Sequence, residues 1–474
     1  MYGLHAHAGK LYAGGSFTNI GGATANRVAW SDGTNWFPLG SGVTRVANVN
    51  HIYGTDYGVF ASGYFTNIGG TGAWAVARWD WTDEKWHGLG ALVPTDSADK
   101  RGLFFSRNIN GYANFMCPYK DQTMVAGGYF TNSDYRGPLH YVAHWNGEVF
   151  TNMAYGFSNV VMCGAYDSLR DVLYVGGSFT NRNKADTSLN MSYVAEWTGT
   201  DWTNVGRGLG NRVVAMAVHP GNGNLYVAGW FTNYWNDAGQ SGDARYVAMW
   251  DREARAWTNV GAGFNNWVYA LAFDSQSNLI AGGAFTNIYL GSHWTPLAEP
   301  CQAQRVAKWD GTTWTNIGLG LSDTVLSLAA GRQGEIYASG FFRTAYELDG
   351  SSTQAWYVAK YAPSEINSPG IEPSSGSVTG GYPVTISGLN LGDGTDITNV
   401  TLCGVGAAAI ISQTETQVVI AAGASGVTGL GDVRLFSTSY GETVKSNAFT
   451  YAGPVIVLRG TNQVALTSDA AASV

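Results

Sequence analysis

The sequence predicts an all-β protein, a seven-bladed β-propeller followed by an immunoglobulin-like β-sandwich. Three observations lead to this fold class. The stretch "LYAGGSFTN" at residues 11–19 recurs along the chain, and the sequence changes character after residue 362. The 474 residues also include 64 Gly, 18 Trp and 26 Tyr but few charged side chains, a composition that favours strands joined by tight turns over helices.

The recurring stretch marks a repeated supersecondary unit. It returns roughly every 50 residues, a period typical of propeller blades. Each copy contains one phenylalanine, and in chain order these are Phe17, Phe65, Phe130, Phe179, Phe231, Phe285 and Phe342. We therefore expect residues 1–362 to form seven blades.

Each unit contains four segments of strand length. In the sixth unit they are residues 267–274, 278–286, 305–311 and 313–320, with small or turn-forming residues between them. The second segment carries a Gly-Gly pair, which lets neighbouring backbones approach closely where wedge-shaped sheets crowd together. The third reads Val-Ala-x-Trp and ends in an Asx-Gly turn signal, and the fourth opens with an aromatic residue. We expect these glycines and aromatic residues to serve packing.

These motifs resemble the Gly-Gly-x-Phe-Thr and Val-Ala-x-Trp-Asp-Gly repeats of bacterial extracellular β-propellers, which are loosely similar to Kelch-type propellers. The resemblance implies the fold, but such families share no catalytic residues, so it implies no activity. A Pro/Ser/Gly-rich segment, residues 363–370, is expected to be a linker. Residues 371–453, from "IEPSSGSVTGGYPVTISGLNL" to "NAFTYAG", resemble an IPT/TIG domain, an immunoglobulin-like sandwich found beside adhesion and polysaccharide-handling modules.

The seventh unit and the tail predict unpaired strand edges. The seventh unit has segments 324–330, 335–342 and 356–362 but no fourth one, so its blade should lack an outer strand, and an exposed edge invites pairing. The tail, residues 454–474, has strand character in its apolar residues. We expect it to add to a sheet edge in its own molecule or in a neighbour, where repeated addition gives rings or filaments. The residues expected to pair are Val455, Ile456, Val457, Leu458, Val464 and Leu466.

Composition argues against two kinds of partner. The net charge is −8 and no run of Lys or Arg occurs, so we predict no binding of nucleic acid. No apolar stretch approaches about 18 residues, so we predict no insertion into a membrane. The first repeat begins at residue 11, so we expect the sequence to start at a trimmed or mature N-terminus of an extracellular or cell-surface protein.

Insertions between repeats indicate where binding residues gather. Connections from second to third strand and from blade to blade share one face of a propeller, and these connections carry the insertions: 91–111, 181–192, 233–245, 288–304 and 344–355. Aromatic rings beside Asn and Asp suit a carbohydrate, although the same rings would also staple long loops to the propeller. The predicted ligand-binding residues are Tyr234, Trp235, Asn236, Asp237, Tyr289, His293 and Trp294.

Catalytic signatures are lacking in the sequence. No nucleophile elbow, phosphate-binding loop or zinc-binding motif occurs, and we predict no catalytic residue, metal or cofactor. His5 and His7 alternate on the first strand and would face the same way, but no third ligand is evident. Copper-radical oxidases combine a Kelch propeller with an immunoglobulin-like domain, which keeps an enzyme as an alternative. Cys117 and Cys163 lie at similar points of consecutive repeats, and we expect buried free thiols rather than a disulfide.

These observations favour a secreted or cell-surface structural or adhesive protein that is not an enzyme and that self-assembles, its tail forming a filament by strand addition. A carbohydrate-binding propeller that recognises surface glycans is the first alternative. An enzyme similar to the Kelch-type oxidases, or a hydrolase, is the second.

Overall fold

The protein is all-β. The computed structural model describes the chain except for residues 44–46, 90–110, 131, 134–136, 182–190, 237–239, 290–303, 332–333, 347–351, 439, 454, 460–462 and 468–474. Every regular element in the described residues is a strand. These residues contain no helix long and apolar enough to cross a membrane. The chain divides into two compact units, Met1–Arg332 with Ile336–Lys360, and Tyr361–Val474 with the short segment Gln333–Glu335.

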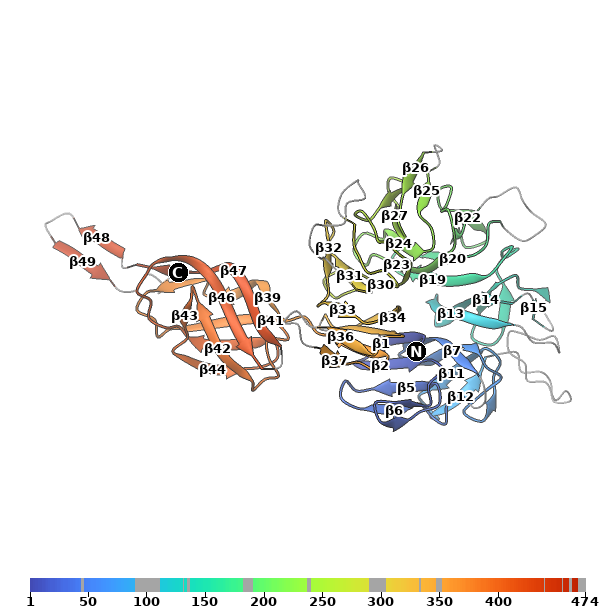
Figure 1. Cartoon of the computed structure of the whole chain (residues 1–474), viewed down its shortest axis with the longest axis horizontal. Helices are drawn as coiled ribbons and strands as arrows, with labels where there is room; N and C mark the ends of the chain where they lie inside the picture. The colour runs from blue at the N-terminus through green and yellow to red at the C-terminus, as the bar shows by residue number, and fades with distance from the viewer. Residues whose placement is uncertain are drawn as a thin grey trace. The chain divides into compact units, whose positions relative to one another are not determined.

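The first unit is a β-propeller. The blades in its described residues are six four-stranded sheets and one three-stranded sheet, in chain order around a ring (Figure 1). The first strands of neighbouring sheets contact one another, and β34 contacts β1, which closes the ring. These inner strands are β1 (Gly3–His7), β7 (Asn48–Thr55), β13 (Tyr112–Tyr119), β19 (Val161–Asp167), β23 (Val213–Val218), β29 (Val268–Phe273) and β34 (Val325–Ala330).

Outside the inner strands each blade continues with antiparallel strands. The second strands are β2 (Lys10–Gly14), β8 (Gly58–Tyr64), β14 (Thr123–Tyr129), β20 (Val172–Gly177), β24 (Leu225–Gly229), β30 (Leu279–Gly283) and β35 (Ile336–Gly340). The third strands are β5 (Val28–Ser31), β11 (Val76–Asp80), β17 (Val142–Trp145), β21 (Val194–Trp197), β27 (Val247–Asp251), β31 (Val306–Trp309) and β38 (Val358–Tyr361). The fourth strands are β6 (Trp36–Pro38), β12 (Lys85–Gly88), β18 (Phe150–Asn152), β22 (Trp202–Asn204), β28 (Ala256–Asn259) and β32 (Trp314–Asn316).

The seventh blade has no fourth strand among the described residues, as the sequence predicts, because its sheet is β34-β35-β38. Short strands lie in the connections between second and third strands: β3 (Asn19–Ile20) with β4 (Ala23–Thr24), β9 (Asn67–Ile68) with β10 (Thr71–Gly72), β15 (Asn132–Ser133) with β16 (Gly137–Pro138), β25 (Asn233–Trp235) with β26 (Ser241–Asp243), and β36 (Thr344–Tyr346) with β37 (Ser352–Gln354). On its other side β36 pairs with β33 (Gly320–Leu321), which lies in the connection from blade 6 to blade 7.

Aromatic residues of the repeat hold neighbouring blades together. The repeat phenylalanines are buried in six copies, and Phe17 is partly buried. The indole N–H at the start of a fourth strand donates to a backbone carbonyl just after the fourth strand of the preceding blade, at 2.9 to 3.1 Å. The four donor–acceptor pairs are Trp86 to Leu39, Trp202 to Met153, Trp257 to Val205, and Trp314 to Val260.

The first glycine of the Gly-Gly pair explains the close packing of blades that the sequence predicts. A Cβ on these glycines would lie 2.5 to 2.8 Å from a Cγ1 atom of a valine on the inner strand of the next blade. Small residues replace the glycine in other blades, where Ser62, Ala228 and Ser339 are buried. The glycine–valine pairs are Gly14 with Val49, Gly127 with Val161, Gly176 with Val213, and Gly282 with Val325.

The second unit contains a two-sheet sandwich. One sheet has the order β39 (Glu365–Glu372), β41 (Pro383–Leu389), β45 (Gln417–Ala421), β44 (Ala409–Gln413), and the other β40 (Ser375–Ser377), β47 (Gly441–Ala452), β46 (Gly429–Ser437), β42 (Ile397–Leu402), β43 (Val405–Gly406). Alternate residues such as Val384 and Ile386 are buried in one core, as expected for strands with one face inward. The segment expected to be a linker, 363–370, is mostly strand β39. Its Pro/Ser/Gly-rich part falls where the pairing with β41 is interrupted, between Ile366 and Ile371.

The tail forms strands, as expected, but they pair with each other. In the described residues β48 (Val455–Arg459) and β49 (Gln463–Thr467) make a separate two-stranded antiparallel sheet, with Val455 opposite Thr467 and Leu458 opposite Val464. The expected addition of the tail to another sheet edge of its own molecule therefore does not hold. Pairing with a neighbouring molecule remains a prediction.

Candidate binding site at the propeller mouth

A β-bulge in the inner strands shapes one face of the propeller. This face, where inner strands begin and second strands end, is here called the loop face. Six inner strands carry a β-bulge after their first or second residue, each time next to the residue paired with the second glycine of the repeat. A Cβ on that glycine would lie only 2.0 to 2.2 Å from a backbone carbonyl oxygen of the inner strand's start. Only glycine fits this approach. The glycine–carbonyl pairs are Gly63 with Asn48, Gly128 with Tyr112, Gly177 with Val160, Gly229 with Arg212, Gly283 with Trp267, and Gly340 with Thr324.

The close approach sets two side chains of each of these six blades beside each other on the loop face. One belongs to the residue that supplies the carbonyl, and the other to the variable residue after the second glycine, the x of Gly-x-Phe. In blade 2 these are Asn48 and Tyr64, which are register partners, and in blade 3 they are Tyr112 and Tyr129. In blade 5 the Trp230 amide donates to the Arg212 carbonyl at 3.1 Å. The repeat backbone thus carries a ring of variable side chains.

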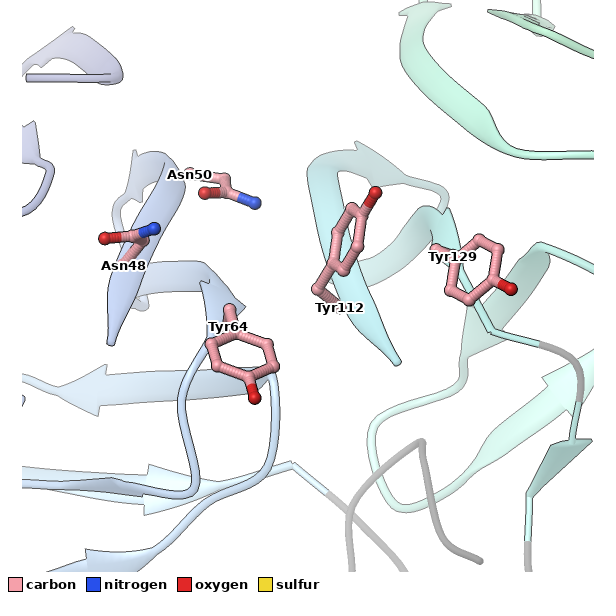
Figure 2. A pocket seen from close by; sticks show the side chains of 5 residues that line it. All are labelled: Asn48, Asn50, Tyr64, Tyr112 and Tyr129. Atoms are coloured by element: carbon pink, nitrogen blue, oxygen red, sulfur yellow. The ribbon is translucent and has the colours of Figure 1, made fainter. Parts of the chain in front are cut away.

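A cavity of about 580 Å³ opens in this ring between blades 2 and 3. The described residues that line it are Asn48 and Asn50 of β7, Tyr64 at the end of β8, Tyr112 of β13 and Tyr129 at the end of β14 (Figure 2). Asn50 is the extra residue of the β7 bulge, and Figure 2 shows it facing Tyr112 across the space between the two inner strands. The bulge therefore re-aims an amide toward the cavity.

The cavity offers flat rings and neutral hydrogen-bonding groups. Tyr64 and Tyr129 are each 43% exposed, and the Tyr112 and Tyr129 rings stack with centroids 5.8 Å apart and planes at 23°. The two amides and three phenols both donate and accept hydrogen bonds. Ring faces beside amides suit a polyhydroxylated ligand, and the volume lies within the ~300–1,000 Å³ of ligand pockets.

A second aromatic group lies on the loop face at blades 5 and 6. Trp230 and Trp267 stack almost in parallel, with ring centroids 4.2 Å apart and planes at 5°. The Arg212 guanidinium lies 4.2 Å from the Trp230 ring centroid. Trp267 is 37% exposed, and Tyr269, the extra residue of the β29 bulge, meets it edge to face at 6.3 Å.

The described loop residues predicted from the sequence do not line this cavity, and they contact their own or a neighbouring blade. Asn236 is tied to the fourth strand of blade 5, because its Oδ1 accepts from the Trp257 amide at 2.6 Å and its Nδ2 donates to the Trp257 carbonyl. Tyr234 packs against the buried cluster of blades 4 and 5. Tyr289 stacks with the Arg245 guanidinium, whose carbon lies 4.6 Å from its ring centroid.

These contacts are those of loops stapled to the propeller. Trp235 is partly buried, and its backbone pairs with residues 207 and 208. Three other predicted residues, Asp237, His293 and Trp294, lie outside the described residues. Carbohydrate binding by this loop set remains a prediction.

The residues that line the cavity were not predicted from the sequence, because they lie inside the repeat itself. The variable position reads Ser16, Tyr64, Tyr129, Ser178, Trp230, Ala284 and Phe341 in the seven copies. The neighbouring residues scarcely change from copy to copy, so an aromatic residue at this position is easily taken for one of the packing residues. Its variation between serine and tryptophan was the available signal.

His5 and His7 of the first inner strand both contact other residues of the protein. The His5 Nδ1 accepts from the Gly54 amide at 3.0 Å, its ring stacks on Tyr53, and burial lowers the pKa of His5 to about 3. His7 Nε2 lies 2.9 Å from an Asp56 carboxylate oxygen. In the described part of the chain, no group of three or more His, Cys, Asp or Glu residues is arranged to hold a metal ion.

The cysteines described in the structure are free thiols, as expected. Cys117 and Cys163 are buried, and burial raises the pKa of Cys117 to about 12 and also raises the pKa of Cys163. Cys403 is partly buried, and Cys301 lies outside the described residues. Thiols in this state are packing residues.

Comparisons with known proteins agree with this architecture. The IPT/TIG domain family matches residues 368–451, and a beta-propeller family described as a domain of unknown function, DUF5122, matches residues 9–29. A comparison with curated proteins gave no match. Two similar solved chains come from "Crystal Structure of Mitotic Checkpoint Complex" and "Crystal structure of WD40 beta propeller domain of Doa1".

The first solved chain is 11% identical with a TM-score of 0.42, covering 66% of this chain and 78% of its own. The second is 10% identical with a TM-score of 0.42, covering 74% of this chain and 90% of its own. Both are too distant for their functions to bear on this protein. The family models thus support a propeller followed by a TIG domain.

Proposed function

We propose that the protein is a non-catalytic, surface-associated binding protein whose propeller holds a carbohydrate at the mouth of its loop face. Propeller and TIG domains are typical of binding or structural modules, and their combination is compatible with a surface or adhesion-type protein. The observation that carries the proposal is the cavity between blades 2 and 3, where three tyrosines and two asparagines converge.

The chemistry of the cavity matches a sugar in two ways. The exposed rings of Tyr64 and Tyr129 can stack against the C–H face of a pyranose, while the amides of Asn48 and Asn50 pair with its hydroxyl groups. The five described lining residues are tyrosines and asparagines, without a carboxylate or imidazole among them, which favours binding over acid–base chemistry.

Tyr129→Ala is expected to raise the Kd for the bound oligosaccharide at least about tenfold, because it removes a stacking face and frees Tyr112 to move. A glycan array identifies the ligand, and isothermal titration calorimetry measures the Kd. Tyr155→Ala is the matched control, since Tyr155 is 60% exposed, follows the fourth strand of blade 3 and does not line the cavity. Unchanged affinity in Tyr129→Ala, or binding to no glycan, contradicts the proposal.

An open strand edge favours self-assembly as a second function. In the described residues no strand pairs with the outer edge of β38, whereas six blades have a fourth strand there. A strand from another molecule can add to such a sheet edge through backbone hydrogen bonds. We propose that the tail supplies this strand. To do so, β48 and β49 would have to separate from each other.

Deleting residues 455–474 is expected to abolish concentration-dependent assembly, because the deletion removes the donor strands. Sedimentation velocity over a concentration series measures the assembly, and negative-stain microscopy shows its form. A chain with the tail replaced by a Gly/Ser segment of equal length is the control for chain length. Assembly that persists in either variant, or a full chain that stays monomeric throughout, overturns strand donation.

A further inference from the structure

The stack of Arg212, Trp230 and Trp267 places a positive charge on the loop face, whereas the described residues that line the cavity between blades 2 and 3 include no Arg or Lys. We propose that these residues form a subsite for an acidic sugar, so that the ligand of the propeller is a polysaccharide bearing uronic acid carboxylates. This inference rests on the proposed carbohydrate binding and specifies its substrate class.

The position of the stack supports a shared ligand. Arg212 and Trp230 are the carbonyl and variable residues of blade 5, the same two repeat positions that Tyr112 and Tyr129 occupy in blade 3. Trp267 is the carbonyl residue of blade 6. Both groups therefore lie on the loop face of one closed ring, on blades 2–3 and 5–6, and an extended polymer can contact both.

The charge on Arg212 has no partner in the described part of the chain. No described carboxylate or carbonyl oxygen pairs with its guanidinium group, which is held instead by the face of Trp230 at 4.2 Å. Some other arginines pair with a carboxylate, such as Arg78 with Asp80 at 2.5 Å and Arg170 with Asp167 at 3.0 Å. An unpaired cation on a chain of net charge −8 points to an anionic ligand.

The geometry favours a carboxylate on a sugar ring. Stacking on Trp230 holds the guanidinium plane but leaves its N–H edges to donate, and two parallel N–H groups match the two oxygens of a carboxylate. The outer face of Trp267 is supported from behind by Trp230, so it is a firm platform for a pyranose ring. Arg212 and Trp267 both stack on Trp230, so the two groups come from different sugar residues of one acidic chain: a ring stacks on Trp267, and the carboxylate of another residue pairs with Arg212.

The test compares uronate oligosaccharides with their methyl esters, which keep the sugar ring but lose the charge. Oligomers of galacturonic, glucuronic, mannuronic and guluronic acid are screened on an array, and the tightest binder and its ester are titrated by calorimetry. We expect esterification to weaken binding about tenfold, and Arg212→Gln to weaken binding of the acid about tenfold while leaving the ester unchanged. Trp267→Ala should weaken both forms.

Arg255→Gln is the matched control, because the Arg255 guanidinium also lies over a tryptophan, 5.8 Å from the Trp250 ring centroid, but in the turn between third and fourth strands. Raising NaCl from 50 to 500 mM should weaken binding of the acid and spare the ester. Binding of neutral glycans with no uronate binding, or equal loss of acid and ester affinity in Arg212→Gln, overturns the subsite while the proposed function stands. Binding to acidic peptides but to no glycan overturns both.

Discussion

Trp257→Ala is expected to lower the free energy of unfolding of the propeller by about 4 kcal/mol. Trp257 is 1% exposed and packs against Trp250, with ring centroids 5.4 Å apart. Its indole N–H also donates to the Val205 carbonyl of the preceding blade at 3.0 Å. The substitution leaves a large cavity and a buried carbonyl without its donor, and each costs stability.

Denaturant unfolding followed by near-ultraviolet circular dichroism measures this loss. Trp257→Phe is the informative companion, because blade 3 has buried Phe150 at the same repeat position. It keeps most of the packing and loses the hydrogen bond, so its cost should be about 1 to 2 kcal/mol. Equal stability of the alanine variant and the parent would show that the inter-blade tryptophans do not hold the ring together.

Gly177→Ala is expected to destabilise the propeller by about 3 kcal/mol, whereas Gly176→Ala should cost about 1 kcal/mol. A Cβ on Gly177 would lie 2.2 Å from the Val160 carbonyl oxygen, which also accepts the Ser178 amide at 2.8 Å. That backbone cannot move without breaking the bond. A Cβ on Gly176 would meet the side chain of Val213 at 2.7 Å, and Ala228 occupies the equivalent place in blade 5.

The two adjacent substitutions add the same methyl group to the same strand, so each controls for the other. Unfolding midpoints of both variants, with circular dichroism to confirm the fold, measure the difference. If Gly176→Ala is as costly as Gly177→Ala, the bulge and its carbonyl do not explain the second glycine.

The repeat pattern was sufficient to predict the fold, because each unit encodes its own strands and turns. Seven phenylalanines and their glycines indicated the blades, and the missing fourth segment after Tyr361 indicated the three-stranded sheet. The first glycine, as in Gly176, was correctly attributed to crowding between blades. The second, as in Gly177, was not, because a β-bulge depends on pairing and leaves no mark in a single strand.

Pairing partners and side-chain uses were the parts that the sequence could not settle. The tail segments had recognisable strand character, but only the backbone shows that β48 pairs with β49. The Pro/Ser/Gly content of residues 363–370 read as a linker because proline and glycine suit interrupted pairing as well as loops. An asparagine such as Asn236 looks the same in sequence whether it binds a sugar or holds a neighbouring strand.

A crystal structure of the protein with its tightest-binding oligosaccharide would show whether the propeller holds a carbohydrate on its loop face. We expect a sugar ring against Tyr64 and Tyr129 on the loop face (Figure 2), with the chain of sugars continuing toward Trp267. An oligosaccharide bound at the opposite face of the propeller or on the TIG domain, with the cavity between blades 2 and 3 empty, would contradict it.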